Sequence, residues 1–260
     1  MTGLQRVILG VGFCVIGGCS LGPRESFTFQ ADMPENFEID GTAYYKPAPG
    51  EECDFSSDKE RYDAGRTFFR PIQPKAAHRV EFKVPLTARA HGCSLVLRSL
   101  DLGFEGQWGP RDSNKGMQYG GLSIRDETSE NTPPFPDSGT LELQGQCQWF
   151  FRTYGAYRYI VKTPKCRALD TNGVVKKSLI GGAVPREQLA GKTVRLELTI
   201  AAKEKPYYRD FWIETPNGWK PCTGLWGTAN EELCVKPYKF LESFKLLDGR
   251  VCTVYPNCTE

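Results

Sequence analysis

Histidine is scarce in this chain of 260 residues, which contains only His78 and His91. Histidine is the commonest general base near neutral pH and the commonest metal ligand, so its scarcity argues against imidazole-based catalysis or metal binding. His78 opens a predicted strand, and His91 precedes a Gly-Cys turn. We therefore interpret each of them as a surface or turn histidine.

The sequence also lacks the short motifs that mark common catalytic and cofactor sites. No H-E-x-x-H pair, Walker phosphate loop or G-x-G-x-x-G turn occurs, and the single G-x-S-x-G match, residues 18–22 (GCSLG), follows the N-terminal apolar run instead of joining a strand to a helix. Residues 56–59 (SSDK) fit the S-x-x-K pattern of penicillin-binding enzymes by letter only, because they lie in a polar stretch without a predicted helix. No C-x-x-C pair occurs either, which argues against a zinc site. These absences predict a non-enzymatic protein with no metal and no other cofactor.

A strong excess of one charge sign is missing as well. The chain has 33 Lys and Arg against 31 Asp and Glu, a net charge of +2. This balance excludes a general nucleic-acid-binding protein, which needs a concentrated positive charge. With 15 Phe, 11 Tyr and 5 Trp available to bury, disorder is excluded too, and we expect one large or two small folded domains.

Long apolar runs are limited to the N-terminus, where residues 7–18 (VILGVGFCVIGG) follow a single arginine. A helix of this length spans about 18 Å, which is too short for the roughly 30 Å hydrocarbon core of a bilayer. A charged start, a short apolar run and a small-residue exit are typical of a secretory signal peptide, which we assign to residues 1–18. Residues 19–26 would then form a short tether before the fold.

The exit of that run, Ile16-Gly17-Gly18-Cys19, resembles the bacterial lipobox. The resemblance implies cleavage before Cys19, a diacylglyceryl thioether on its sulfur and an acylated amino terminus, so that several acyl chains anchor the protein. In Gram-negative lipoproteins a residue other than Asp after the lipidated cysteine, here Ser20, implies delivery to the outer membrane, facing the periplasm. The alternative is an ordinary signal peptide cut nearby, with Cys19 paired elsewhere.

Ten cysteines are present, and eight remain once Cys14 is removed with the signal peptide and Cys19 is assigned to lipid. An even number in an exported, oxidising compartment predicts four disulfides. The spacing favours pairing in chain order, although eight cysteines allow 105 pairings. The pairs so predicted are Cys53–Cys93, Cys147–Cys166, Cys222–Cys234 and Cys252–Cys258.

From Phe27 onward the pattern is β throughout. Apolar and polar residues alternate in many short segments, and turn signals such as Asp40-Gly41 and the Pro-Asn-Gly at 216–218 lie between strand-like residues. The segments with the clearest alternation are 27–31, 78–86, 93–104, 120–126, 140–151, 157–163, 192–202, 209–215 and 250–256. Helical character is confined to 184–190 and 232–244. The pattern predicts a mainly β fold, an antiparallel sandwich-like body stapled by disulfides.

A polar, proline-rich stretch at residues 127–139 divides the predicted strands into two groups. We expect two packed β lobes, an N-terminal lobe at 27–132 and a C-terminal lobe at 140–260. One continuous sandwich is the alternative.

Basic and aromatic residues are interleaved between residues 147 and 180, where seven Lys and Arg stand against a single Asp. Alternate residues of a strand share a face, so Tyr157 and Tyr159 would oppose Arg158. One face would be core and the other a basic surface for an acidic protein partner or a charged headgroup layer. The partner-binding candidates are Arg152, Tyr157, Arg158, Lys162, Lys165 and Arg167. The alternative is a solvated face over an aromatic core.

The whole layout, a lipobox, a short tether, a cysteine-rich β body and no enzymatic motif, resembles the lipoprotein immunity factors of type VI secretion systems. Among these it resembles the factors paired with phospholipase-type effectors. The resemblance covers the chain as an architecture, together with residues 16–19, and no internal motif carries binding residues over. It implies a protein that binds a toxin delivered by neighbouring cells and blocks its active site in the periplasm.

Two other functions stay open from the sequence. One is a structural or assembly lipoprotein of the cell envelope. The other is a glycan hydrolase that uses carboxylates from the acidic stretch at 51–63, such as Asp58 or Glu60, although spacing alone cannot place two carboxylates in one pocket. A tryptophan-rich run at 211–234, with Trp212, Trp219 and Trp226, either stacks on a ligand such as a sugar or fills the core of a disulfide-stapled lobe.

Overall fold

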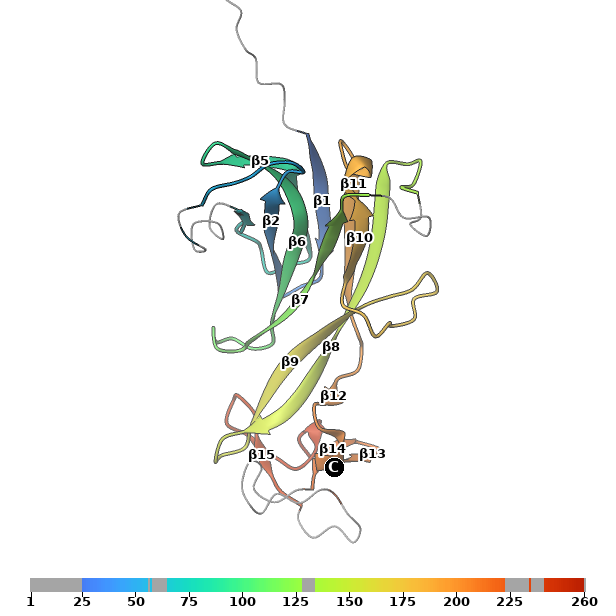
Figure 1. Ribbon diagram of the computed structural model, residues 1–260. Helices are drawn as coiled ribbons and strands as arrows, with labels where there is room; N and C mark the ends of the chain where they lie inside the picture. Colours follow the sequence, from blue (N-terminus) through green and yellow to red (C-terminus); the bar gives the residue numbers. More distant parts are fainter. Residues whose placement is uncertain are drawn as a thin grey trace, which may run out of the picture.

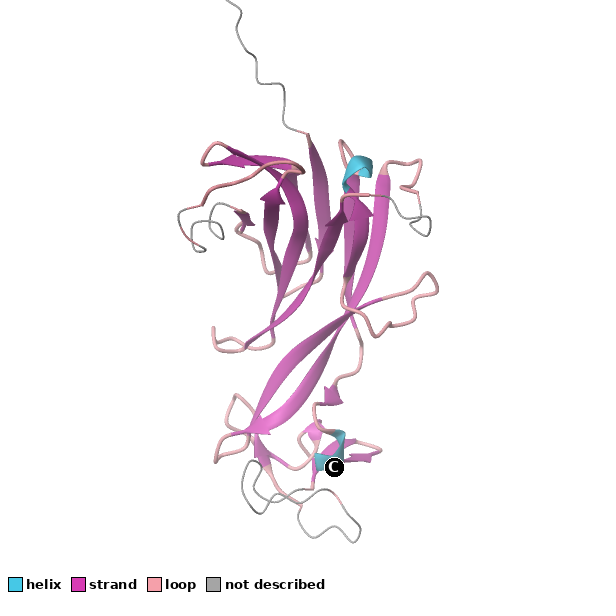
Figure 2. Cartoon of the chain, in the orientation of Figure 1, coloured by secondary structure: helices cyan, strands magenta, loops and turns pink. Residues whose placement is uncertain are grey.

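Strands dominate the computed structural model, which describes residues 25–55, 57, 65–127, 134–222, 234 and 241–259 (Figures 1 and 2). The mainly β architecture predicted from the sequence is confirmed, with several sheets packed together. Helix in these residues is limited to two short 3-10 turns, Arg186–Gln188 and Arg209–Phe211. The first lies within the helical turn predicted at 184–190, whereas most of the segment at 232–244 lies outside the described residues. Among the described residues, no helix has the length and apolar composition that a membrane span requires.

Two large sheets and one small sheet make up the structure. The eight-stranded sheet runs in the order β16 (Val251–Cys252), β15 (Phe244–Lys245), β9 (Tyr159–Ala168), β8 (Thr140–Tyr154), β11 (Thr193–Ile200), β1 (Ser26–Met33) and β4 (His78–Pro85), with β12 (Lys205–Pro206) also paired to β8. The six-stranded sheet runs in the order β10 (Gly181–Pro185), β7 (Lys115–Arg125), β6 (Cys93–Gln107), β2 (Phe37–Pro47) and β3 (Arg66–Phe69), with β5 (Thr87–Ala90) also paired to β6. The three-stranded sheet contains β13 (Trp212–Thr215), β14 (Gly218–Pro221) and β17 (Tyr255–Pro256).

The main hydrophobic core lies between the two large sheets and draws side chains from both. In β1 every second residue is buried, so Phe27, Phe29, Ala31 and Met33 point into the sandwich. Strands β2 and β6 supply the facing side, with fully buried side chains such as Leu102. Alternation of apolar and polar residues produces this arrangement, because the opposite sheet can cover only one face of each strand.

The antiparallel pairing of β2 with β6 contains an irregularity. Tyr44 lies opposite Ser99 and Tyr45 lies opposite Leu97, so the pairing skips Arg98. The extra residue shifts the inside–outside alternation of β6, and Leu97 and Leu100 are both fully buried as a result.

Asp40 and Gly41 do not form the turn that their dipeptide suggested, because β2 runs through both of them unbroken. Both residues pair with β6, and Gly41 also pairs with Phe69 of β3 on the other side. A Cβ at Gly41 would lie 3.0 Å from the ring of Phe82 in the facing sheet. The glycine therefore allows the two sheets to approach closely, and this is the physical reason for its place inside a strand.

Several strand pairs are parallel, so the sandwich is mixed rather than wholly antiparallel. β11 lies between β1 and β8 and is parallel to both, and β10 is parallel to β7. These pairs also join the two segments expected to form separate lobes, since β1 and β7 belong to 27–132 whereas β10 and β11 belong to 140–260. Both large sheets therefore contain strands from both segments. Alternation of apolar and polar residues does not specify which strand lies beside which. Two neighbouring strands can be parallel wherever the connection between them is long enough for the chain to return to the same end of the sheet.

A second, smaller core lies where the β8–β9 hairpin extends beyond the sandwich (Figure 1). Phe151 of the hairpin packs here with Trp212 and Tyr255. We call the outer part of the hairpin, together with residues 205–222 and 241–259, the C-terminal module. The rings of Phe151 and Trp212 meet edge to face with their centroids 4.9 Å apart, so Trp212 is a core residue.

The four predicted disulfides are present and link cysteines in chain order. Cys147 and Cys166 lie directly opposite each other in β8 and β9, and both are fully buried. β11 pairs with β8 only as far as Cys147. This disulfide therefore lies at the point where the hairpin leaves the sandwich, and it ties the two strands together before they enter the C-terminal module.

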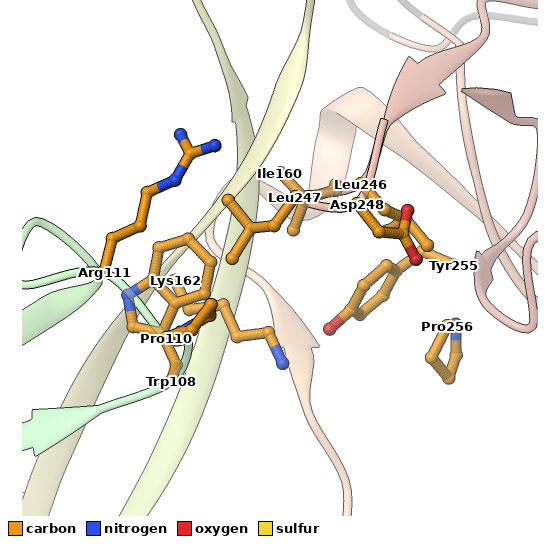
Figure 3. Close-up of a pocket in the computed structure, with 10 residues that line it drawn as sticks. All are labelled: Trp108, Pro110, Arg111, Ile160, Lys162, Leu246, Leu247, Asp248, Tyr255 and Pro256. Atoms are coloured by element: carbon orange, nitrogen blue, oxygen red, sulfur yellow. The ribbon is translucent and has the colours of Figure 1, made fainter. Parts of the chain in front are cut away.

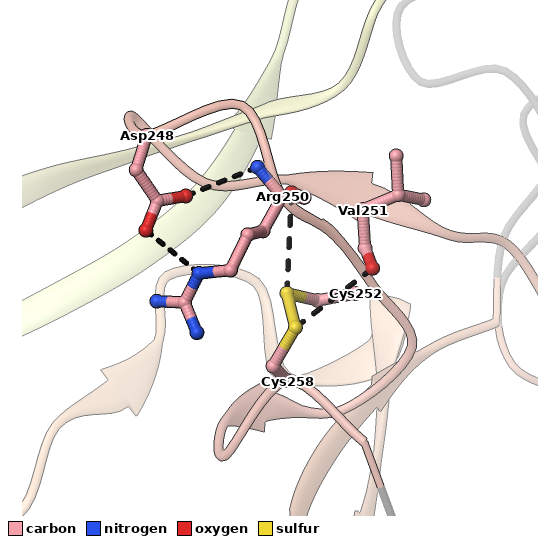
Figure 4. The surroundings of a disulfide bond; sticks show 5 residues. All are labelled: Asp248, Arg250, Val251, Cys252 and Cys258. Atoms are coloured by element: carbon pink, nitrogen blue, oxygen red, sulfur yellow. Dashed lines mark hydrogen bonds and ion pairs between the residues drawn. A yellow bond between two sulfur atoms is a disulfide. The ribbon is translucent and has the colours of Figure 1, made fainter.

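The Cys252–Cys258 disulfide closes the last turn of the described chain (Figure 4). In the preceding turn, the carboxylate of Asp248 accepts hydrogen bonds from the backbone N–H of Arg250 at 3.0 Å and from its Nε at 2.7 Å. The N–H of Cys258 donates to the carbonyl of Val254 at 2.6 Å. One covalent bond and several local hydrogen bonds thus hold a segment that has little regular strand pairing.

Candidate protein-binding site

The end of the β8–β9 hairpin carries three exposed tyrosines. Tyr154, Tyr157 and Tyr159 have exposed fractions of 60%, 69% and 38%. The centroids of the Tyr157 and Tyr159 rings lie 6.4 Å apart, and Nζ of Lys245 lies 4.9 Å from the centroid of the Tyr157 ring. We call these four residues the tyrosine tip. Protein interfaces use surfaces of this kind, because tyrosine offers a large contact area with few rotatable bonds.

Arg158, a predicted surface residue, is buried beside this tip. Strand β9 begins at Tyr159 rather than at Tyr157, and the turn places Arg158 in the left-handed region with a φ of 52°. Its exposed fraction is 8%, and its carbonyl accepts a hydrogen bond from the N–H of Lys245. Burial lowers the pKa of the Arg158 guanidinium, and the charge of Glu242 acts in the opposite direction. The strand alternation predicted here fails because a turn replaces it, leaving both tyrosines exposed and the arginine inside.

The pairing register divides the remaining basic candidates between the two faces of the hairpin. Directly paired residues point to the same side, and Lys162 is paired with the buried Phe151. Lys165 and Arg167 therefore lie on the opposite face from Lys162, and Arg152 of β8 shares their face. The six predicted residues do not form one continuous surface.

On the face that carries Lys165, aromatic rings order the basic side chains. Nζ of Lys165 lies 4.5 Å from the centroid of Phe150 and 4.2 Å from that of Tyr207. The Cζ atom of Arg152 lies 5.6 Å from the centroid of the Tyr154 ring. The negative faces of these rings attract the cations and hold them in place, so this face combines positive charge with aromatic area.

On the opposite face, Lys162 belongs to a hydrogen-bonded chain that ends at Tyr255. Nζ of Lys162 lies 2.6 Å from Oε1 of Glu204, and the hydroxyl of Tyr255 donates to Oε2 of the same carboxylate. Burial raises the pKa of Tyr255, and the charge of Glu204 and the hydrogen bond to it act in the same direction. Lys162 is thus engaged inside the protein, which removes its charge from the set available to a partner.

A cavity of about 440 Å³ lies between the sandwich and the C-terminal module (Figure 3). We call it the junction cavity; Trp108 and Arg111 from the β6–β7 connection, Lys162 from β9, and Leu247 and Tyr255 from the C-terminal segment are among the residues that line it. The Nε1 atom of Trp108 is buried and has no hydrogen-bond partner within the described part of the chain. The cavity has the size of a small-ligand site, but most of its polar groups are already paired.

A second cavity, of about 420 Å³, lies between β12 and the β13–β14 hairpin. We call it the β12 cleft; its lining residues are Phe150, Lys205, Pro206, Tyr207, Arg209, Glu214 and Trp219. Three of these residues are aromatic, and its two cations face a single carboxylate. Sequence reasoning reached Trp219 of this site, through the tryptophan-rich run, and missed its cations. The run at 205–209 (KPYYR) interleaves basic and aromatic residues as the stretch at 147–180 does, and that composition was the signal that could have found it.

The described residues show no arrangement suited to metal binding, and one histidine has a structural place. No group of three or more His, Cys, Asp or Glu among them is arranged to hold a metal ion. Nδ1 of His78 lies 2.7 Å from the carbonyl of Ala76, and Nε2 lies 3.1 Å from Oε1 of Gln73. Cys19, the lipidation candidate, and the carboxylates suggested for glycan hydrolysis at 58 and 60 lie outside the described residues.

No protein-family model matches this chain, and no curated protein sequence and no solved structure matches it either. The surfaces that can bind a partner are therefore distinguished by their own chemistry. They are an exposed tyrosine tip, a cationic and aromatic β12 cleft, and a mainly apolar junction cavity. All three lie on the C-terminal module or at its border with the sandwich, which makes this module the candidate binding region.

Proposed function

We propose that this protein is a non-enzymatic lipoprotein of the outer membrane that faces the periplasm and binds another protein through its C-terminal module. The observation that carries the proposal is the tyrosine tip, where three large aromatic side chains are exposed together. Exposing aromatic surface to water is unfavourable, so a partner that covers this surface gains free energy of binding. Tyrosine is also among the residues that most often dominate the energy of protein interfaces.

The position of the tip suits a tethered binding protein. Strand β1 begins at Ser26 at one end of the elongated molecule, and the end of the β8–β9 hairpin lies at the other (Figure 1). Only residues 20–25 separate Cys19 from this strand in the sequence. A lipid on Cys19 would therefore hold the sandwich near the membrane and present the tip toward the periplasm.

The partner, in this proposal, is a toxin of the phospholipase type that neighbouring cells deliver and that the protein neutralises. The support is the likeness in layout to immunity lipoproteins of type VI secretion systems, with the lipobox at 16–19 as its local feature. Four disulfides and two hydrophobic cores give a body that needs little ordering on binding, which favours tight capture.

The test uses the full chain, with its own signal sequence, in cells that also send a candidate toxin, the protein that the full chain captures in a pull-down, to the periplasm. Growth of the cells is measured, and so is the affinity of the lipoprotein for a catalytically inactivated form of that toxin. We expect the wild type to protect the cells and to bind. The double variant Tyr154→Ala/Tyr157→Ala should lose at least about tenfold in affinity. The matched control is Tyr119→Ala, a tyrosine on β7 of the sandwich with an exposed fraction of 62%, which should leave affinity and protection unchanged.

Each outcome decides one part of the proposal. A wild type that neither binds the toxin nor protects the cells excludes neutralisation. A tyrosine double variant that binds as tightly as Tyr119→Ala excludes the tip as the interface. Binding to an envelope assembly protein, without protection from any toxin, would assign the structural or assembly function instead.

A further inference from the structure

We propose that the β12 cleft binds an acidic segment of the partner protein, a short run of Asp or Glu side chains. This inference rests on the proposed function, because it states the chemistry of one contact that the partner makes with the C-terminal module. The cleft and the tyrosine tip both use the β8–β9 hairpin, since Phe150 of β8 lines the cleft and Tyr154 ends the same strand. One partner can therefore contact both.

Two cations line the cleft without an ion-pair partner in the part of the chain that the structure describes. Lys205 and Arg209 are exposed, and neither side chain makes a salt bridge or hydrogen bond there. The one carboxylate among the lining residues belongs to Glu214, which is exposed as well. Cations on a concave surface attract anions strongly, because the low-dielectric walls concentrate their field.

Lys165 adds a third positive charge beside the aromatic wall of the cleft. Its ammonium group is close to the rings of Phe150 and Tyr207, which both line the cleft and meet edge to face with centroids 6.4 Å apart. The ring faces hold this ammonium in position, so the charge is ordered before a ligand arrives. Three cations against one carboxylate make the cleft complementary to an acidic ligand.

The shape of the cleft favours a polypeptide over a lipid surface. A cavity of about 420 Å³, bounded by β12 on one side and by the β13–β14 hairpin on the other, admits side chains, whereas a bilayer surface is flat. The rings of Tyr207 and Trp219 offer apolar contact to the methylene groups of Glu and to residues that flank an acidic run. An acidic protein segment satisfies both the charge and the apolar wall.

The test measures binding of a peptide of about eight glutamates to the lipidated full chain in detergent, by calorimetry at low and high salt. A lysine peptide of equal length and vesicles of phosphatidylglycerol serve as comparison ligands. We expect the glutamate peptide to bind, the lysine peptide not to bind, and salt to weaken the affinity. The variant Lys205→Glu/Arg209→Glu should lose at least about tenfold in affinity. The matched control Lys176→Glu/Lys177→Glu changes the charge equally at exposed positions between β9 and β10, and its affinity should stay within about twofold of the wild type.

Several results would overturn the inference. Unchanged peptide binding in Lys205→Glu/Arg209→Glu would do so, and so would an equal loss in the control variant, which would reveal unspecific attraction. Vesicle binding that needs the two cations, without binding of the peptide, would assign the cleft to an anionic membrane instead.

The cleft and the proposed function fail separately. A toxin that binds the wild type and Lys205→Glu/Arg209→Glu equally, but loses affinity for Tyr154→Ala/Tyr157→Ala, overturns the role of the cleft and leaves the proposed function standing. A wild type that binds no toxin, yet binds the glutamate peptide through the two cations, overturns the proposed function and supports the acidic specificity of the cleft.

Discussion

The hydroxyl of Tyr255 donates a hydrogen bond to the carboxylate of Glu204. Glu204 lies in the connection that leads from β11 of the sandwich to β12, whereas Tyr255 lies in β17 near the C-terminal end. Lys162 of the hairpin lies 2.6 Å from the other carboxylate oxygen. Three distant parts of the sequence are thus joined by one carboxylate, which fixes the C-terminal module to the hairpin.

Removing this hydroxyl should destabilise the module and change its response to alkali. We expect Tyr255→Phe to lower the free energy of unfolding by about 1–3 kcal/mol, because Glu204 loses a partly buried donor. The folded-state pKa of Tyr255 is raised, so its contribution is complete below the unfolded pKa of about 10 and is lost as the pH rises above it. The variant should lack this alkaline loss.

Urea unfolding, followed by tryptophan fluorescence at neutral and alkaline pH, checks both effects. The control is Tyr119→Phe at an exposed position of β7. If the difference in stability between wild type and Tyr255→Phe is the same at both pH values, the hydrogen bond from Tyr255 to Glu204 is not the cause of the loss of stability at alkaline pH.

The disulfides should differ in their contribution to stability according to the loop that each one closes. Cys53 and Cys93 are separated by 40 positions, and Cys252 and Cys258 by 6. The chain-entropy relation gives about 4 kcal/mol for the first loop and about 2 kcal/mol for the second. Replacing each pair by alanine and measuring urea unfolding should therefore give the larger loss for the pair at 53 and 93. The reverse order would mean that local packing, rather than loop entropy, decides the effect.

Two adjacent glycines of β10 should tolerate alanine very differently. Gly181 has a φ of 136°, and a Cβ there would collide with the carbonyl oxygen of Gly121 on the paired strand β7. A Cβ at Gly182 meets nothing within 4 Å. Gly181→Ala should lower the free energy of unfolding by more than about 1 kcal/mol, and Gly182→Ala should change it by less than about 0.5 kcal/mol. Equal effects in urea denaturation would argue against the close pairing of β10 with β7.

Asp32 should contribute to stability above acidic pH. It lies between two arginines on the outer face of the sandwich, with Nε of Arg79 at 2.6 Å and Nη2 of Arg195 at 2.8 Å. The hydrogen bond from Arg79 is the main cause that lowers the pKa of Asp32; burial acts against it, and Arg195 adds to the lowering. The stabilisation is therefore present above the unfolded pKa of about 3.9 and is lost as the pH falls through the lower folded value.

Asp32→Asn tests this dependence. The variant should be less stable than the wild type near neutral pH, and the difference should shrink as the pH falls below about 4. Thermal unfolding at several pH values measures it, with Asp101→Asn at an exposed position of β6 as the control. A difference that stays constant down to low pH would contradict the role of the carboxylate charge.

Lipidation at Cys19 gives a prediction about location. Cys19→Ser should move the protein from the membrane fraction to the soluble periplasmic fraction, because the thioether needs the cysteine sulfur. Ser20→Asp should keep the lipid but retain the protein in the inner membrane, as the resemblance to Gram-negative lipoproteins implies. Fractionation and mass spectrometry of the N-terminal peptide measure both, and a wild-type N-terminal peptide that carries no acyl chains would exclude this anchor.

Short-range patterns predicted most of the longer β strands and favoured the disulfide pairing that the structure shows. The residues of β1 alternate between apolar and polar, and one face of each strand must be buried, so the pattern indicates both the strand and its inner face. Three of the four disulfides join cysteines at most 19 positions apart, as with Cys147 and Cys166 on paired strands, so their spacing was informative. The Cys53–Cys93 disulfide spans 40 positions and follows the same chain order.

The sequence by itself indicated most of the longer strands and their buried faces, and its spacing favoured the pairing of cysteines in chain order that the structure has. Only the tertiary structure decided that β11 lies beside β1, that a turn buries Arg158, and that Lys162 is held by Glu204 while Lys205 and Arg209 line a cleft. The physical reason is that backbone hydrogen bonds between strands are the same for any sequence. Alternation therefore specifies the face of a strand but not its neighbour, and a site built from several strands appears only when those neighbours are known.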